Sequence, residues 1–212
     1  MTKALRIVLI LVVSVFALQA QTFYGTTDLK TFRDGREKEF RDAKESPLKA
    51  EDFAKFKGLD YFPVLKGFTV TAIFTKTSGE KFFDMPNSAG QSDRYIKYAT
   101  LSFRLSNKAF RLNVYRPDPE SMKDFPEYKD ILLIPFLDLT NKTETYGGGR
   151  YINILEPKGK AVTLDFNLAY NPSCSYGSGR YSCPVPPKVN TINLAVTAGE
   201  KKFIYTGYEK TH

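Results

Sequence analysis

The sequence predicts a mainly β protein: an antiparallel β-sandwich or partly closed β-barrel with one or two short N-terminal α-helices. Three observations lead to this prediction. After Pro63, apolar and polar residues alternate along most of the chain, as in strands with one buried face. The chain of 212 residues has 17 Phe and 13 Tyr, which favour strands. The segments between the alternating runs are rich in Gly, Pro, Asn and Asp, and no helical pattern separates them, so parallel crossovers are not expected.

The first 20 residues have the pattern of a secretory signal peptide. Lys3 and Arg6 precede an apolar run at residues 7–18, and cleavage is expected after Ala20. This run is shorter than the roughly 20 apolar residues that cross a bilayer. We therefore expect an exported protein, periplasmic or extracellular, with residues 21–212 as one domain and no transmembrane span after cleavage. An uncleaved N-terminal anchor is the alternative.

Two helices are expected at the start of the mature chain. Residues 28–44 have apolar side chains near helical spacing among charged ones, and Thr26 or Thr27 is expected to cap this helix. Pro47 ends it and begins a second short helix that stops at Gly58.

About nine strands are expected after the helices. They cover residues 68–75, 81–84, 95–105, 110–114, 131–136, 150–155, 161–167, 191–196 and 201–206.

The charge and the histidine count exclude several classes of function. Removal of Lys3 and Arg6 leaves 29 basic and 23 acidic residues, a net charge of +6 spread along the chain, so a nucleic-acid partner is not predicted. An anionic ligand is compatible with this charge. The single histidine is His212, which excludes the common His-dependent catalytic and zinc sites. No phosphate loop or dinucleotide fingerprint occurs, and we predict no cofactor and no metal.

Two cysteines enclose a loop of eight residues. Because the protein is expected to be exported, Cys174 and Cys183 are predicted to form a disulfide. A redox-active pair and a pair of thiolate ligands remain as alternatives.

Three glycines precede Arg150 at the start of an expected strand. Their backbone amides and this guanidinium form an anion-binding nest in one interpretation, and the glycines supply a turn or bulge in the other. Asp138 and Thr140 follow one expected strand, and Asp165 and Asn167 end another. These four residues form a polar ligand-binding cluster in one interpretation and simple Asx or Thr turns in the other. Arg94 opens the strand expected at residues 95–105, and alternation along this strand puts Arg94 and Tyr98 on the face opposite Leu101.

An ordered series of motifs resembles the bacterial family called domain of unknown function 1684, over residues 36 to 202. The motifs are Arg94-Tyr-x-x-Tyr98, Ile134-Pro-Phe-x-Asp-x-Thr140, Thr145-Tyr-Gly-Gly-Gly-Arg-Tyr151, Leu164-Asp-Phe-Asn-x-Ala-Tyr-Asn-Pro-x-Cys174, Cys183-Pro-x-Pro-Pro-x-x-Asn190 and Ala198-Gly-Glu-Lys201. The resemblance implies no established activity, ligand or catalytic residue. Members commonly have Glu where this chain has Val189, which removes one candidate acid.

A binding module for a small polar or anionic ligand is the leading hypothesis. The alternatives are a structural or assembly protein of the cell envelope, and a hydrolase or lyase that uses Asp138 or Asp165 beside Tyr146 and Arg150. The sequence predicts no oligomeric state. The candidate ligand-binding residues are Arg94, Tyr98, Asp138, Thr140, Tyr146, Arg150, Asp165, Asn167, Tyr170 and Asn190.

Overall fold

A computed structural model describes residues 23–123 and 128–204 of the chain. The predicted signal peptide, the end of the last expected strand and His212 lie outside these residues.

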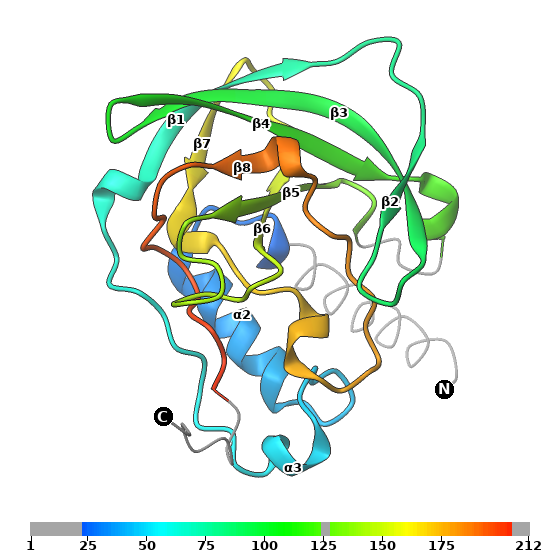
Figure 1. Cartoon of the computed structure of the whole chain (residues 1–212), viewed down its shortest axis with the longest axis vertical. Helices are drawn as coiled ribbons and strands as arrows, with labels where there is room; N and C mark the ends of the chain where they lie inside the picture. Colours follow the sequence, from blue (N-terminus) through cyan, green and yellow to red (C-terminus); the bar gives the residue numbers. More distant parts are fainter. Residues whose placement is uncertain (1–22, 124–127, 205–212) are drawn as a thin grey trace, which may run out of the picture.

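The described residues form one eight-stranded sheet that curls into a half barrel (Figure 1). Its main path runs in the order β6-β5-β4-β3-β1-β7, with β2 added beside β3 and β8 beside β5. The pairs are antiparallel apart from β5 and β8, which are parallel. The predicted fold class is therefore confirmed, in the form of a partly closed barrel. The strands are β1 (Thr69–Lys76), β2 (Phe83–Pro86), β3 (Ser92–Leu105), β4 (Lys108–Pro117), β5 (Ile131–Asp138), β6 (Arg150–Leu155), β7 (Ala161–Asp165) and β8 (Thr191–Ile192).

The inner face of the sheet carries the main hydrophobic core. The alternation in β3 turns Ala99, Leu101, Phe103 and Leu105 inward, where they are 0–5% exposed. Side chains from β4, β5 and β6 and from the C-terminal segment complete this core. The predicted period of two thus determines which side chains are buried.

Strand β1 changes partner at Ile73. It pairs with β7 over Thr69–Ile73 and with β3 over Ile73–Lys76. The β1–β3 ladder ends at the pair Ile73 and Ser102, although β3 continues to Leu105. The two strands therefore diverge towards the β3–β4 hairpin.

Two helices lie below the half barrel in Figure 1. The longer one passes beneath β5 and β6, and the shorter one lies at the bottom of the view, away from the sheet. They are α2 (Leu29–Arg41) and α3 (Ala50–Phe53), and both were predicted. The cap of α2 is Asp28, whose side chain accepts a hydrogen bond from the Thr31 N–H over 2.7 Å. The prediction of Thr26 or Thr27 as the cap was wrong. Asp is as good an N-cap residue as Thr, and Asp28 lies three residues before Thr31, whose N–H it binds.

Two expected strands differ from the structure. Only Thr191–Ile192 of residues 191–196 forms a strand, because the chain then bends to place Val196 and Ala198 in the core. Residues 201–204 form no strand, and their hydrogen bonds go instead to single carbonyls of Asp60 and Glu144. Tertiary contacts decide the backbone of this C-terminal segment.

Candidate functional site

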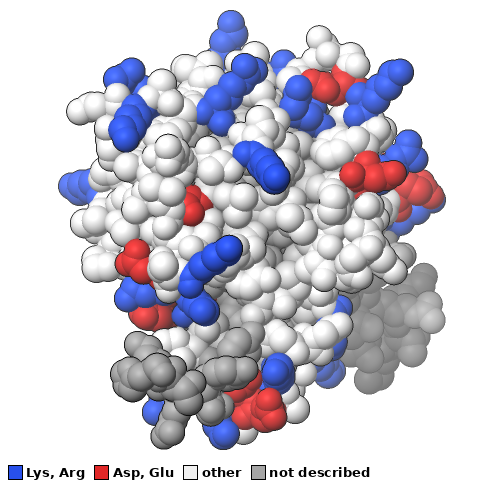
Figure 2. Space-filling model, in the orientation of Figure 1, with Lys and Arg blue, Asp and Glu red and all other residues white. Residues whose placement is uncertain are grey.

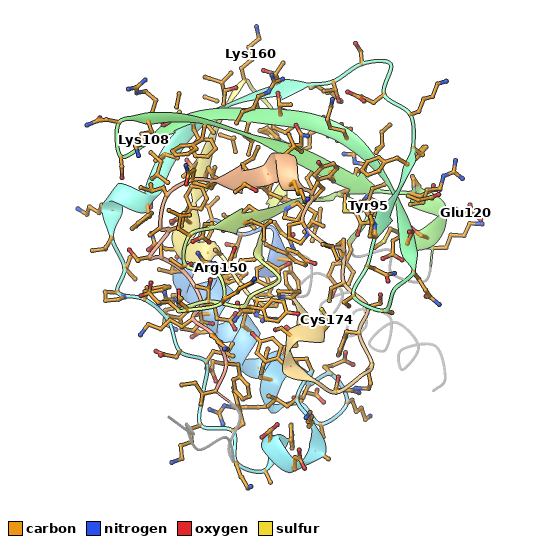
Figure 3. The ribbon with its side chains drawn as sticks, in the orientation of Figure 1. Tyr95, Lys108, Glu120, Arg150, Lys160 and Cys174 are labelled. Atoms are coloured by element: carbon orange, nitrogen blue, oxygen red, sulfur yellow. The ribbon has the colours of Figure 1, made fainter. Side chains whose placement is uncertain are left out.

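The side chain of Arg150 lies fully buried near the middle of the molecule (Figure 3). Its Nη2 donates to Asp138 Oδ2 over 2.9 Å and to the carbonyl of Val196 over 2.8 Å. Its Nη1 donates to the carbonyls of Ala198 and Glu200. Burial lowers the pKa of the Arg150 guanidinium, and the nearby Asp138 carboxylate opposes this shift. Arg150 thus connects β6 with β5 and with the C-terminal segment.

The second oxygen of Asp138 is also engaged. Oδ1 accepts hydrogen bonds from the backbone N–H of Thr140 (2.8 Å), from the Thr140 hydroxyl (2.6 Å) and from the backbone N–H of Val196 (3.2 Å). Three predicted site residues, Asp138, Thr140 and Arg150, are therefore brought together. They hydrogen-bond mainly to one another and to the backbone, as a structural cluster does.

The glycine run before Arg150 forms a tight turn. Gly149 has φ +94°, and a Cβ atom there would lie 2.6 Å from the carbonyl oxygen of Phe136. The Gly149 N–H donates to the carbonyl of Tyr146 over 3.2 Å. This geometry fits the turn interpretation, because the guanidinium points into the core and the glycine is needed for its positive φ.

Asp165 and Asn167 fix the segment that leads into β1. Asp165 Oδ1 accepts from the backbone N–H of Asn167 (2.9 Å) and from its Nδ2 (2.7 Å). The Asn167 carboxamide also accepts from the N–H of Leu65 (3.3 Å) and donates to its carbonyl (3.2 Å). These contacts match the Asx-turn interpretation of the two residues.

Asn190 is fully buried between β4 and β5. Its Oδ1 accepts from the Asn113 N–H, and its Nδ2 donates to the carbonyls of Asn113 and Pro135 over 2.9 and 2.8 Å. Pro135 has no N–H to donate to a neighbouring strand, and the β4–β5 ladder consists of one pair, Tyr115 and Leu133. The side chain of Asn190 thus supplies the hydrogen bonds that the two strands do not make directly.

Tyr98 lies at a β-bulge in β3. Strict alternation predicted it on the face opposite Leu101, and this was wrong because the bulge turns the ring towards the core, 6.5 Å from the ring of Phe74. The guanidinium of Arg116 lies 3.7 Å from the Tyr98 ring, and the Tyr98 hydroxyl donates to Glu156 over 2.5 Å.

Arg94 lies apart from the Arg150 cluster. Its side chain is 61% exposed, with Nε 3.6 Å from Asp118. The structure therefore does not join Arg94 to the other predicted site residues.

The other two predicted tyrosines, Tyr146 and Tyr170, have different surroundings. Tyr170 is buried, and its hydroxyl accepts from Asn153 Nδ2 over 2.8 Å. Tyr146 is half-buried near Cys174 and Cys183, and burial raises the pKa of its hydroxyl. Of these two, Tyr146 has the partly open position.

A second buried charged cluster, which sequence reasoning missed, joins α2 to the C-terminal segment. Arg36, 0% exposed, donates to Glu200 over 3.3 Å and to Glu39 over 3.1 Å. Glu200 also accepts from Asn171 Nδ2 (3.0 Å) and from the Tyr176 hydroxyl. Burial raises the pKa of Glu200, and the Arg36 charge opposes this shift. The sequence signal was an arginine at helical spacing between Phe32 and Phe40 on the buried face of α2.

Cys174 and Cys183 lie side by side as free thiols. The backbone N–H of Cys174 donates to Cys183 Sγ over 3.1 Å. The predicted disulfide is not formed in this structure and stays a prediction. The interaction with the Cys183 thiol lowers the pKa of Cys174 to about 7, against the effect of burial.

A groove of about 820 Å³ opens where β1 diverges from β3. Val70, Phe103 and Phe110, which also contact the main core, provide its apolar part. Arg104 and Arg111 line it as well, from β3 and β4. Arg104 donates to the carbonyl of Asn107, and Arg111 donates to the Thr100 hydroxyl over 3.3 Å. Both guanidiniums have further N–H groups that can bind an anion.

No helix in residues 23–123 or 128–204 has the length and hydropathy to cross a bilayer. In the same ranges, no three His, Cys, Asp or Glu side chains gather as a metal site would require.

Comparison with known proteins identifies the family. Residues 54–201 match the family described as "Protein of unknown function (DUF1684)". The chain belongs to DUF1684. No curated protein matches this chain. Among solved structures, this DUF1684 chain is similar to an uncharacterized protein of Haloarcula marismortui determined by solution NMR, with 37% identity and a TM-score of 0.63. The match covers 82% of this chain and 91% of the other.

The groove arginines of this DUF1684 chain were also missed by sequence reasoning. Arg104 and Arg111 lie on the outward positions of two correctly predicted strands. Nothing in the sequence indicates that β1 leaves β3 beside them. The alternation could have placed the two arginines on one face, but not beside a groove.

Proposed function

We propose that this chain is an exported binding module that holds a small anionic ligand with an apolar portion in the groove between β1 and the β3–β4 hairpin. The groove of about 820 Å³ with two arginines in its lining is the observation that supports this proposal. Its size is in the range of small-molecule sites, roughly 300–1,000 Å³. Export rests on the pattern of residues 1–20.

The charges around the groove favour an anion. Arg104 and Arg111 each donate a side-chain hydrogen bond to a neutral group, so their positive charges are available to a ligand. Guanidiniums bind carboxylate and phosphate oxygens through parallel N–H groups. Lys and Arg are scattered over the viewed surface rather than gathered in one stripe (Figure 2), which fits a small ligand better than a nucleic acid.

The apolar part of the groove favours a ligand that also has hydrocarbon. Ile73 of β1 lines the groove and is 48% exposed, Val70 and Phe110 are half-buried, and Phe103 is buried in the main core with its ring centroid 5.9 Å from that of Phe110. Burial of hydrocarbon against such side chains contributes about 25 cal/mol for each Å². The ligand class is therefore an amphipathic carboxylate or phosphate.

The hydrolase or lyase alternative is less well supported by the geometry. Asp138 is paired with Arg150, and Asp165 accepts two hydrogen bonds from Asn167. Neither carboxylate lines the groove. A general acid or base needs access to a substrate proton, and this groove offers it to neither aspartate.

Titration calorimetry with dodecanoate tests the proposal. The double variant R104A/R111A is expected to bind dodecanoate at least about tenfold more weakly than wild type, because two charged hydrogen-bond donors are lost. The control is K38A/R41A, which removes the same charge from α2, away from the groove. Equal affinities of the two double variants, or equal binding of dodecanol and dodecanoate by wild type, would overturn the proposal.

A further inference from the structure

The two cysteines lie where a loop and a hairpin of the sheet meet. Cys174 belongs to the short 3-10 helix Ser173–Tyr176, and Cys183 ends the loop that follows. The Cys183 N–H donates to the Ser88 hydroxyl over 3.1 Å, and the Ser88 N–H donates to the Cys183 carbonyl over 2.9 Å. Cys183 is thus held by its backbone, with Cys174 beside it.

The loop between the cysteines is anchored along its length. Arg180 donates to the carbonyls of Lys44 and Ser46, and the Tyr181 hydroxyl donates to the carbonyl of Glu45 over 2.6 Å. These contacts fix the loop against the end of α2. The anchored loop holds Cys183 where its thiol already interacts with that of Cys174.

The two thiols differ in exposure. Cys183 is 8% exposed, whereas Cys174 is only partly buried. A nucleophilic thiol must be reached by its partner molecule, while a resolving thiol needs only to reach the first sulfur. Figure 3 shows Cys174 on the 3-10 helix, well below Tyr95 of the sheet.

The two thiols also differ in acidity. The pKa of Cys174 is lowered to about 7 by interaction with the Cys183 thiol, while that interaction and burial raise the pKa of Cys183. The other titratable groups near the pair are the carboxylate of Asp93 and four tyrosine hydroxyls, those of Tyr95, Tyr146, Tyr151 and Tyr170. The thiolate, which is the reactive form of a cysteine, is therefore favoured at Cys174 over Cys183.

We propose that Cys174 and Cys183 are a redox-active dithiol in which Cys174 is the attacking thiol and Cys183 the resolving thiol. The oxidant is a small-molecule or protein disulfide. Cys174 sulfur attacks one sulfur of this disulfide, which forms a mixed disulfide and releases one thiolate. Cys183 then loses its proton and attacks Cys174 sulfur, which forms the Cys174–Cys183 bond and releases the second thiolate. The dithiol is oxidised by two electrons and the external disulfide is reduced to two thiols.

This inference does not depend on the groove. The groove and the cysteine pair share no residue, so either proposal can fail alone. It also differs from a purely structural disulfide, which needs no accessible sulfur.

Trapping with oxidised glutathione tests the proposal on the reduced mature chain. At pH 7, intact mass should show that wild type loses two hydrogen atoms. C183S should keep one glutathione, and C174S should be modified at least about tenfold more slowly, because its remaining thiol is buried. Modification of C174S as fast as C183S, or glutathione retained on wild type, would overturn the proposal.

Alkylation of wild type needs no variant and guards against a folding defect. After limited treatment of the reduced protein with iodoacetamide, peptide mapping should show Cys174 modified at least about tenfold faster than Cys183, with a rate that is half-maximal near pH 7. Equal rates at the two cysteines in the folded protein would contradict the assignment.

Discussion

The carboxamide of Asn190 pairs with the backbone of Asn113 as a neighbouring strand would. Asn190 Oδ1 accepts from the Asn113 N–H over 2.8 Å, and Asn190 Nδ2 donates to the Asn113 carbonyl over 2.9 Å. The same Nδ2 reaches the carbonyl of Pro135 on the next strand. One side chain thus fills the gap between β4 and β5, so its role is in holding the half barrel together.

Replacement of Asn190 by Ala should destabilise the fold. The change leaves one N–H and two carbonyls without partners in the protein interior, and each buried unpaired group costs about 1–3 kcal/mol. We expect a loss of at least about 2 kcal/mol in the free energy of unfolding, measured by urea denaturation. The control V189A changes a neighbour that is 64% exposed and should stay within about 0.5 kcal/mol of wild type. A similar small effect of N190A would refute the bridging role.

Arg150 and Asp138 should behave as a coupled buried pair. R150M should cost about 3–5 kcal/mol, because it leaves the Asp138 carboxylate buried without its cation. The double variant D138N/R150M should lose less than the sum of the two single losses. Urea denaturation of wild type, D138N, R150M and the double variant gives the coupling energy between the two side chains. Additive losses would contradict the coupling. If R150M were instead stable but unable to bind the ligand, Arg150 would be a binding residue.

Gly149 should not tolerate a side chain. G149A combines φ +94° with a contact of 2.6 Å between the new Cβ and the Phe136 carbonyl oxygen. The expected loss in the free energy of unfolding is at least about 2 kcal/mol. G159A is the matched control, since a Cβ there has no atom within 4 Å and the residue has no positive φ. Equal stability of the two variants would show that the turn can rearrange.

Glu156 should contribute to the acid sensitivity of the protein. Hydrogen bonds from Lys76 and Tyr98 lower the pKa of Glu156 to about 2. A lowered pKa means that this contribution is present above the unfolded value, near 4.5, and is lost as the pH falls towards 2. Because the Glu156 side chain is 37% exposed, solvent screening limits the effect to about 0.5 kcal/mol. Between pH 5 and 2, E156Q should lose stability less steeply than wild type, while E51Q, at a mostly exposed helix residue, should follow wild type. Parallel curves for E156Q and wild type would contradict this expectation.

The sequence predicted the elements whose hydrophobic pattern depends only on neighbouring residues. The strand over residues 150–155 was predicted with the bounds that β6 has, and the helix over residues 28–44 contains α2. The errors lie where distant segments decide the backbone. The bulge at Tyr98 breaks the alternation. Residues 201–204 of the strand expected at 201–206 form no strand, because Glu200 and its neighbours pair with α2 and with loops.

The candidate site was harder to predict. Polar residues at strand ends are equally typical of ligand sites and of buried supports, and only the partners distinguish the two. Asp138, Asn167 and Asn190 have their polar atoms on neighbouring backbone or side chains. Arg104 and Arg111, by contrast, belong to no sequence motif, and only the groove that they line makes them candidates for ligand binding.

The sequence by itself determined the mainly β fold, the two helices and the family resemblance, because periodicity and ordered motifs are properties of the chain read in order. The tertiary structure decided which polar residues meet. It buried Arg150 against Asp138, divided β1 between two partners and set Cys174 beside Cys183. These relationships join residues on different elements, and their free energy depends on burial and on the partners that folding brings within hydrogen-bonding distance.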